Sequence, residues 1–165
     1  AGVPTRVIDH TLFDGREAFE RVLDQALNEA NVELVCLGGF MRVLTPWFVK
    51  RWQDHLLNIH PSLLPAFRGL DTHARALDAG VRVHGCTVHF VRPELDDGPI
   101  VVQGVVPVIE GDTEQSLAAR VLETEHRAYP EALELIASGR ARLIDERIVV
   151  EEGWAGGTIW SELTG

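Results

Sequence analysis

An apolar run that ends in two glycines constrains the fold of this chain more than any other feature. The run VELVCL occupies residues 32–37 and is followed by Gly38-Gly39. Such near-continuous apolar runs are typical of strands buried in a parallel sheet. Further runs at residues 56–60, 86–91 and 100–108 also read as strands. In several segments between these runs, apolar residues recur at the three- and four-residue spacing of helices. This alternation predicts an α/β fold, with three layers and a mostly parallel sheet.

The segments between and around these runs complete the predicted single domain, residues 1–165. Residues 5–8 read as a short strand, and Asp14 with Glu17 resembles the capping box of a helix whose apolar positions span 19–30. Thr45-Pro46 favours the start of a second helix. We expect further helices at residues 69–79 and from Asp112 to Gly139, the latter kinked or broken at Pro130. Residues 142–150 predict a last strand, and residues 151–165 an irregular tail.

The charge balance and the cysteine content exclude several classes of function. Fifteen basic and 25 acidic residues give a formal net charge of −10, which disfavours a nucleic-acid partner and an anionic membrane surface. The apolar runs fall far short of the roughly 20 residues that a membrane span needs. The only cysteines are Cys36 and Cys86, so we expect a reducing compartment and a cytoplasmic location. Neither these cysteines nor the seven histidines follow a metal-ligand spacing, which predicts a site without metal.

Two polar side chains at the end of the second predicted strand could carry chemistry. Asn58 and His60 lie two residues apart in LNIHP, so they point to the same face of a strand. A carboxamide beside an imidazole suits the stabilisation of an oxyanion and the transfer of a proton. The ordinary alternative is a polar strand end with no catalytic role.

A second candidate is the segment LDDGP at residues 95–99. Its composition favours a turn, but Asp96 in a loop after a strand could also orient a water molecule or act on a nearby histidine. Thr87 and His89 lie two residues apart on the preceding strand, so they share one face. His89 is open to two interpretations, a support for the site or a hydrogen-bonded core histidine.

The order of these motifs resembles the glycinamide ribonucleotide formyltransferases of purine biosynthesis. The resemblance rests on GFMRVL at residues 39–44, LLNIHPSLLPAFRGLDTH at 56–73, HGCTVHFV at 84–91, ELDDGPIVVQ at 94–103 and EHRAYP at 125–130. It implies a formyltransferase fold of the Rossmann-like type. It also implies transfer of a formyl group from 10-formyltetrahydrofolate, as co-substrate, to the amine of glycinamide ribonucleotide.

The resemblance assigns roles position by position. It implies Asn58, His60 and Asp96 as catalytic residues, supported by Thr87 and His89. The folate pocket would be lined by Arg42, Val43, Leu44, Asn58, Val91, Glu94 and Asp96. The nucleotide would contact Gly39, Met41, Pro61 and Glu125. For Met41 and Glu125 the ordinary alternatives are a core side chain and a solvated helix residue.

The chain departs from the resemblance at its start, AGVPTRVIDH, where a strand and a Gly-Ser-Asn loop that binds phosphate are expected. We therefore expect the working enzyme to hold a further N-terminal segment. Two alternatives to the transferase stay open. One is a hydrolase that releases formate from 10-formyltetrahydrofolate, and the other is a noncatalytic folate-binding fragment. Small molecules are the expected partners, with the protein a monomer or a homodimer.

Overall fold

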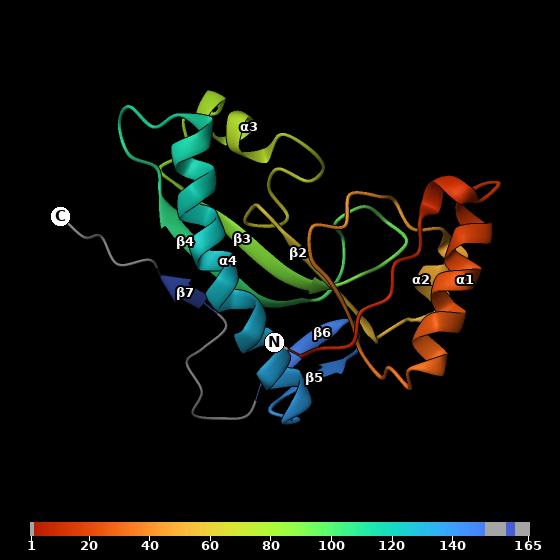
Figure 1. Ribbon diagram of the computed structural model, residues 1–165. Coiled ribbons are helices and arrows are strands. Elements are labelled where there is room, and N and C mark those ends of the chain that lie inside the picture. Colours follow the sequence, from red (N-terminus) through yellow and green to blue (C-terminus); the bar gives the residue numbers. More distant parts are fainter. Residues whose placement is uncertain (1, 151–157, 161–165) are drawn as a thin grey trace.

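The computed structural model describes residues 2–150 and 158–160, and it has a five-stranded sheet at its centre (Figure 1). The strands lie in the order β1-β2-β3-β4-β7. They span Val35–Leu37 (β1), Leu56–His60 (β2), Val83–Phe90 (β3), Ile100–Pro107 (β4) and Thr158–Trp160 (β7). The predicted α/β class is therefore confirmed.

The sheet is mixed, whereas the sequence predicted mostly parallel strands. Strands β1 and β2 pair in parallel, as do β4 and β7. Strands β2 and β3, and β3 and β4, pair antiparallel. For β3 and β4 the reason is their connection, residues 91–99, which contains no helix. A parallel return needs a crossover of about a dozen or more residues, so this connection turns the chain back on itself.

The helices and a small hairpin surround this sheet. A 3-10 turn at His10–Leu12 precedes the helices α1 (Arg16–Glu29), α2 (Pro46–Arg51), α3 (Thr72–Asp78) and α4 (Glu114–Ala137). Strands β5 (Ala141–Ile144) and β6 (Arg147–Val150) form a separate two-stranded hairpin. No helix in the described part of the chain is long and apolar enough to cross a membrane.

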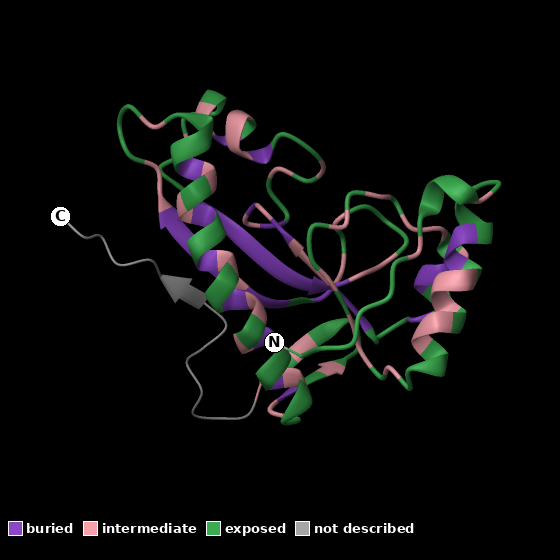
Figure 2. Ribbon diagram, in the orientation of Figure 1, coloured by how far each residue is buried: buried purple, intermediate pink, exposed green. Residues whose placement is uncertain are grey.

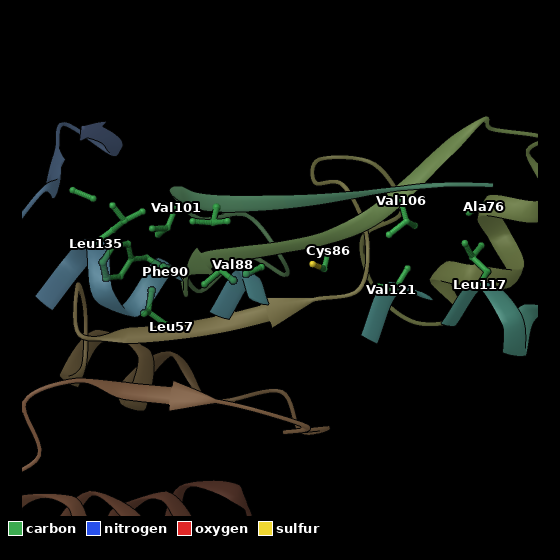
Figure 3. Close-up of a cluster of buried hydrophobic side chains, with 14 residues drawn as sticks. Leu57, Ala76, Cys86, Val88, Phe90, Val101, Val106, Leu117, Val121 and Leu135 are labelled. Carbon is green, nitrogen blue, oxygen red and sulfur yellow. The ribbon is translucent and has the colours of Figure 1, made fainter. Parts of the chain in front are cut away.

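Neighbouring residues of β2 divide the core into two parts on opposite faces of the sheet. Leu57 packs in a cluster with Val88, Val102 and Leu135, so α4 covers this face (Figure 3). Leu56 points the other way and packs with Phe48 and Trp52 of the α2 region. Strands β3 and β4 are largely buried, and α4 packs against both (Figure 2). This arrangement gives the three layers that the sequence predicted.

Several local predictions are wrong, each for a physical reason. Residues 5–8 form no strand, because they have no partner strand in the sheet. Gly15, not Asp14, occupies the N-cap of α1 and makes no side-chain cap bond. Of the kink or break expected at Pro130, the break is absent, because α4 continues to Ala137. The carbonyl left free four residues earlier belongs to His126, which is exposed to water.

The C-terminal predictions also need correction. The single strand expected at residues 142–150 is the β5–β6 hairpin, because Asp145 and Glu146 both have positive φ (48° and 59°) and form a two-residue turn. Within the tail expected to be irregular, Thr158–Trp160 pairs with β4 as β7. The rest of that tail lies outside the described residues.

Candidate active site

The polar residues of β2 and β3 meet on one face of the sheet, as their spacing predicted. Asn58 lies directly opposite His89, and His60 lies opposite Thr87. Directly opposed residues on antiparallel strands point to the same side and lie close together. Four of the predicted site residues are thereby brought into one cluster.

His60 is held between two oxygen acceptors. Its Nδ1 lies 3.5 Å from Oδ2 of Asp96, and its Nε2 lies 3.0 Å from the carbonyl oxygen of Phe67. The side chains of His60 and Asp96 are only 7% and 10% exposed. A neutral imidazole has one N–H donor, whereas an imidazolium has two. The two ring nitrogens of His60 face one carboxylate oxygen and one carbonyl oxygen.

Asp96 reaches His60 because of the backbone around it. Its φ of 49° lies in the left-handed region, which few non-glycine residues adopt. Its Oδ2 also accepts a hydrogen bond of 2.9 Å from the backbone N–H of Gly69. We call residues 91–99 the Asp96 loop. The turn that its composition suggested is present, and it places a carboxylate against the histidine.

His89 fixes the orientation of the Asn58 carboxamide. Nδ1 of His89 lies 2.9 Å from the carbonyl oxygen of Phe90, to which it donates, so Nε2 is left as an acceptor in the neutral ring. Nε2 faces the amide nitrogen of Asn58 at 3.5 Å. Burial lowers the pKa of His89, which keeps the ring neutral. The second N–H of the Asn58 amide is then free for a ligand.

Thr87 holds the segment that follows His60. Its hydroxyl donates to the carbonyl of Ser62 at 2.7 Å and accepts from the backbone N–H of Leu64 at 3.0 Å. The Gln103 amide donates to the same hydroxyl and to the carbonyl of Leu64, each at 3.0 Å. Gln103 was not among the residues predicted from the sequence, although it follows the recognised DDGP segment on β4. These bonds make Thr87 a support of the His60 backbone.

A cavity of about 460 Å³ between the sheet and α4 brings together two residues assigned to the nucleotide. Gly39 and Glu125 both line it, together with Gly38, Ile59, Leu122, His126, Tyr129 and Pro130. Glu125 is half-buried, which raises the pKa of its carboxyl and contradicts the interpretation of a merely solvated residue. Pro61 and Met41 do not line it. Met41 is 83% exposed, so it is not a core side chain either.

The residues assigned to the folate pocket come from two segments. Leu44 and Val91 pack against the Phe48–Trp52–Leu56 cluster. The Arg42 guanidinium lies over the ring of Phe19, 5.7 Å from its centre. Val43 and Glu94 are exposed. The assignment of these residues to the folate stays a prediction.

Buried histidines behind the site predict a loss of stability on acidification. His84 is 1% exposed, with the ring of His73 at 5.3 Å. Burial, reinforced by His73, lowers the pKa of His84 from 6.5 to about 4. Between pH 6.5 and 4 the unfolded state therefore binds a proton at His84 that the folded state does not. The free energy of unfolding should fall by about 3 kcal/mol across this window.

This pH effect can be isolated with a single substitution. Urea unfolding of the unsubstituted protein and of His84→Leu is measured at pH 7 and at pH 4.5. The free energy of unfolding should fall less in the variant than in the unsubstituted protein between these two pH values. The difference should be a large part of the about 3 kcal/mol attributed to His84. Equal losses in both proteins would show that His84 titrates normally in the folded state.

The site as a whole has the chemistry of group transfer. Asn58 presents an N–H donor where a developing oxyanion could be stabilised, His60 lies beside it, and Asp96 can accept or pass on a proton. No group of three His, Cys, Asp or Glu side chains in residues 2–150 and 158–160 is arranged to hold a metal ion. The fold and the site together define an α/β protein with a polar acid–base centre on one face of its sheet.

Comparison with known proteins identifies the family. The sequence profile described as Formyl transferase matches residues 1–133. The chain is 52% identical to the trifunctional purine biosynthetic protein adenosine-3 of Gallus gallus over 97% of its own length and 15% of that protein. It is 46% identical to phosphoribosylglycinamide formyltransferase of Escherichia coli, covering 87% of this chain and 68% of that one. The chain belongs to the formyl transferase family.

Solved structures agree with this assignment. The crystal structure of phosphoribosylglycinamide formyltransferase from Anaplasma phagocytophilum superposes with a TM-score of 0.89, at 41% identity, over 98% of this chain and 76% of that chain. A formyltetrahydrofolate deformylase from Pseudomonas putida is less similar, with a TM-score of 0.76 and 33% identity over 84% and 50% of the two chains. The predicted formyltransferase fold is confirmed.

Proposed function

We propose that this chain transfers a formyl group from 10-formyltetrahydrofolate to the amine of glycinamide ribonucleotide. One observation carries the proposal: the His60 ring lies between the Asp96 carboxylate and the Phe67 carbonyl, beside an Asn58 amide that His89 orients. The identity to the Escherichia coli and Anaplasma phagocytophilum formyltransferases supports this choice of substrates.

In the proposed reaction the amine nitrogen attacks the formyl carbon, and the formyl oxygen becomes an oxyanion. The Asn58 amide donates a hydrogen bond to this oxygen, and the positive charge of the neighbouring His60 imidazolium stabilises it. The carbon–nitrogen bond to the folate then breaks, while the amine loses a proton and the folate nitrogen gains one. Asp96 carries this proton through a water molecule and keeps His60 charged.

The proposal divides the two substrates between the two sides of the cluster. Arg42, Val43, Leu44, Val91 and Glu94 would line the folate side, along with Asn58 and Asp96. Gly39, Met41, Pro61 and Glu125 would contact the nucleotide, and the cavity beside Glu125 supports this placement. We expect no metal in the reaction, since the side chains named supply both the charge stabilisation and the proton transfer. A cytoplasmic, monomeric or homodimeric protein stays a prediction.

Glu125→Gln should separate the two substrates kinetically. Loss of the negative charge removes a charge-assisted hydrogen bond to the nucleotide, which is worth about 1.5–3 kcal/mol. KM for glycinamide ribonucleotide should therefore rise by about 10- to 100-fold, with KM for the folate unchanged. Glu123→Gln is the matched control, because Glu123 lies on the exposed face of the same helix. A similar KM for the nucleotide in both variants would remove Glu125 from the binding site.

The consumption of 10-formyltetrahydrofolate, followed with and without the acceptor, distinguishes the proposal from its alternatives. The transferase requires that consumption depend on glycinamide ribonucleotide. Equal consumption without the acceptor would indicate a hydrolase. The similarity to a formyltetrahydrofolate deformylase supports keeping this alternative. No consumption together with folate binding would indicate a noncatalytic folate-binding protein.

A further inference from the structure

Arg92 makes ion pairs that join three distant segments of the chain. Its Nη2 donates to Oδ1 of Asp54 at 2.7 Å. Its Nε and Nη2 donate to the two carboxylate oxygens of Glu146 at 2.8 and 3.1 Å, the two-pronged geometry that makes arginine–carboxylate pairs strong. Asp54 precedes β2, and Glu146 lies in the turn between β5 and β6.

The guanidinium is buried although both of its partners are exposed. The Arg92 side chain is 9% exposed, while those of Asp54 and Glu146 are 48% and 62% exposed. A buried arginine that loses its partners leaves an unpaired charge, which is far more costly than losing a surface pair. The two carboxylates therefore determine where the Arg92 side chain can lie.

The position of this side chain matters because it lies at the base of the Asp96 loop. The loop closes through a hydrogen bond of 2.9 Å from the N–H of Phe90 to the carbonyl of Pro99. A Cβ on Gly98 would lie 1.8 Å from the Phe90 carbonyl oxygen and 3.3 Å from Cγ of Arg92. The returning backbone therefore passes closely over the first residues of the loop and the Arg92 stem.

The backbone on both sides of the ion pairs is held in an unfavourable conformation. Asp54 (φ 64°) and Glu146 (φ 59°) both adopt the left-handed region, as Asp96 does. Such residues persist only where the surrounding contacts fix them, and they collect at functional sites. The charge pair with Arg92 supplies such a contact for Asp54, whereas Glu146 owes its conformation to the two-residue turn between β5 and β6.

We propose that Arg92 is a positioning residue that holds the base of the Asp96 loop and thereby the contact between Asp96 and His60. The effect of Arg92 on turnover rests on the proposed function, whereas its effect on the structure of the Asp96 loop does not. The β5–β6 hairpin, which contributes no residue to the proposed chemistry, acts on the site through Glu146. Arg92 touches neither His60 nor Asp96 and is not itself catalytic.

Arg92→Met tests this role because it keeps an unbranched stem under Gly98 and removes the charge. We expect kcat to fall by about tenfold, the size of the coupling expected between residues that share a network. KM for glycinamide ribonucleotide should stay unchanged. Glu146→Gln should give a smaller loss, and the double variant should be no worse than Arg92→Met alone. Arg140→Gln is the matched control, because its pair with Glu134 is exposed and remote from the loop.

Amide hydrogen exchange provides a readout that does not depend on activity. The N–H of Gly69 donates to Asp96, and that of Phe90 closes the loop. In Arg92→Met both amides should exchange at least severalfold faster, while the amides of α4 exchange as in the unsubstituted protein. Additive losses of kcat in the double variant, or unchanged exchange at Gly69 and Phe90, would overturn the proposal. A parent protein without transferase activity but with this exchange result would contradict the proposed function alone.

Discussion

Replacing Asp96 with asparagine should lower kcat by about 10²- to 10⁴-fold, the usual loss when a group that transfers protons is removed. Asparagine has nearly the same shape and can still accept the hydrogen bond from Gly69. It carries no charge to hold His60 in its cationic form and cannot take up the proton from the amine. Affinity for the folate should be largely retained, which equilibrium binding measures separately from turnover.

Asp97→Asn is the matched control for this substitution. Asp97 is the adjacent carboxylate of the same loop, but it is half-exposed and pairs with Arg68 on the surface. We expect its kcat to stay within about twofold of the parent, since surface pairs contribute little. Near-normal turnover in Asp96→Asn, or equal losses in the two variants, would exclude Asp96 from the mechanism.

His60→Ala should lower kcat by about 10²- to 10³-fold, the typical cost of removing one group that stabilises the oxyanion. The substitution removes the cation that faces both Asp96 and the formyl oxygen in the proposed geometry. Steady-state kinetics should show the loss in kcat with a much smaller change in KM for either substrate. His55→Ala is the control, because His55 is exposed and its ring lies against the carbonyl of Glu33, away from Asp96.

A structural role of His60 would give a different pattern. If the ring only supports the Phe67 segment, His60→Ala should weaken folate binding and lower stability while kcat at saturation stays near that of the parent. That result would contradict the catalytic assignment and leave Asp96 without its partner. Urea unfolding of the same variant separates the two cases.

The parts of the site that lie on neighbouring strands could be predicted from the sequence. Alternation along a strand fixed which side chains share a face, so Asn58 and His60, and Thr87 and His89, were grouped correctly. Apolar runs do not encode strand direction, however. The short connection at residues 91–99 was the available signal that β3 and β4 run antiparallel.

The contacts made across long sequence separations could not be predicted. The approach of Asp96 to His60 depends on a left-handed backbone and on the N–H of Gly69, 27 residues away. The carbonyl of Phe67, which completes the surroundings of His60, has no side-chain signature. The pairing of Arg92 with Glu146 joins residues 54 positions apart. Only the folded chain brings these groups together.

The destination of the formyl carbon tests the central claim most directly. The protein is given 10-formyltetrahydrofolate labelled with ¹³C in the formyl group, together with glycinamide ribonucleotide, and ¹³C NMR follows the label. Transfer by Asn58, His60 and Asp96 predicts that the label appears as a formamide on the nucleotide amine, and that this signal is lost in Asp96→Asn. Label that appears in free formate, at the same rate with or without the nucleotide, would contradict the account.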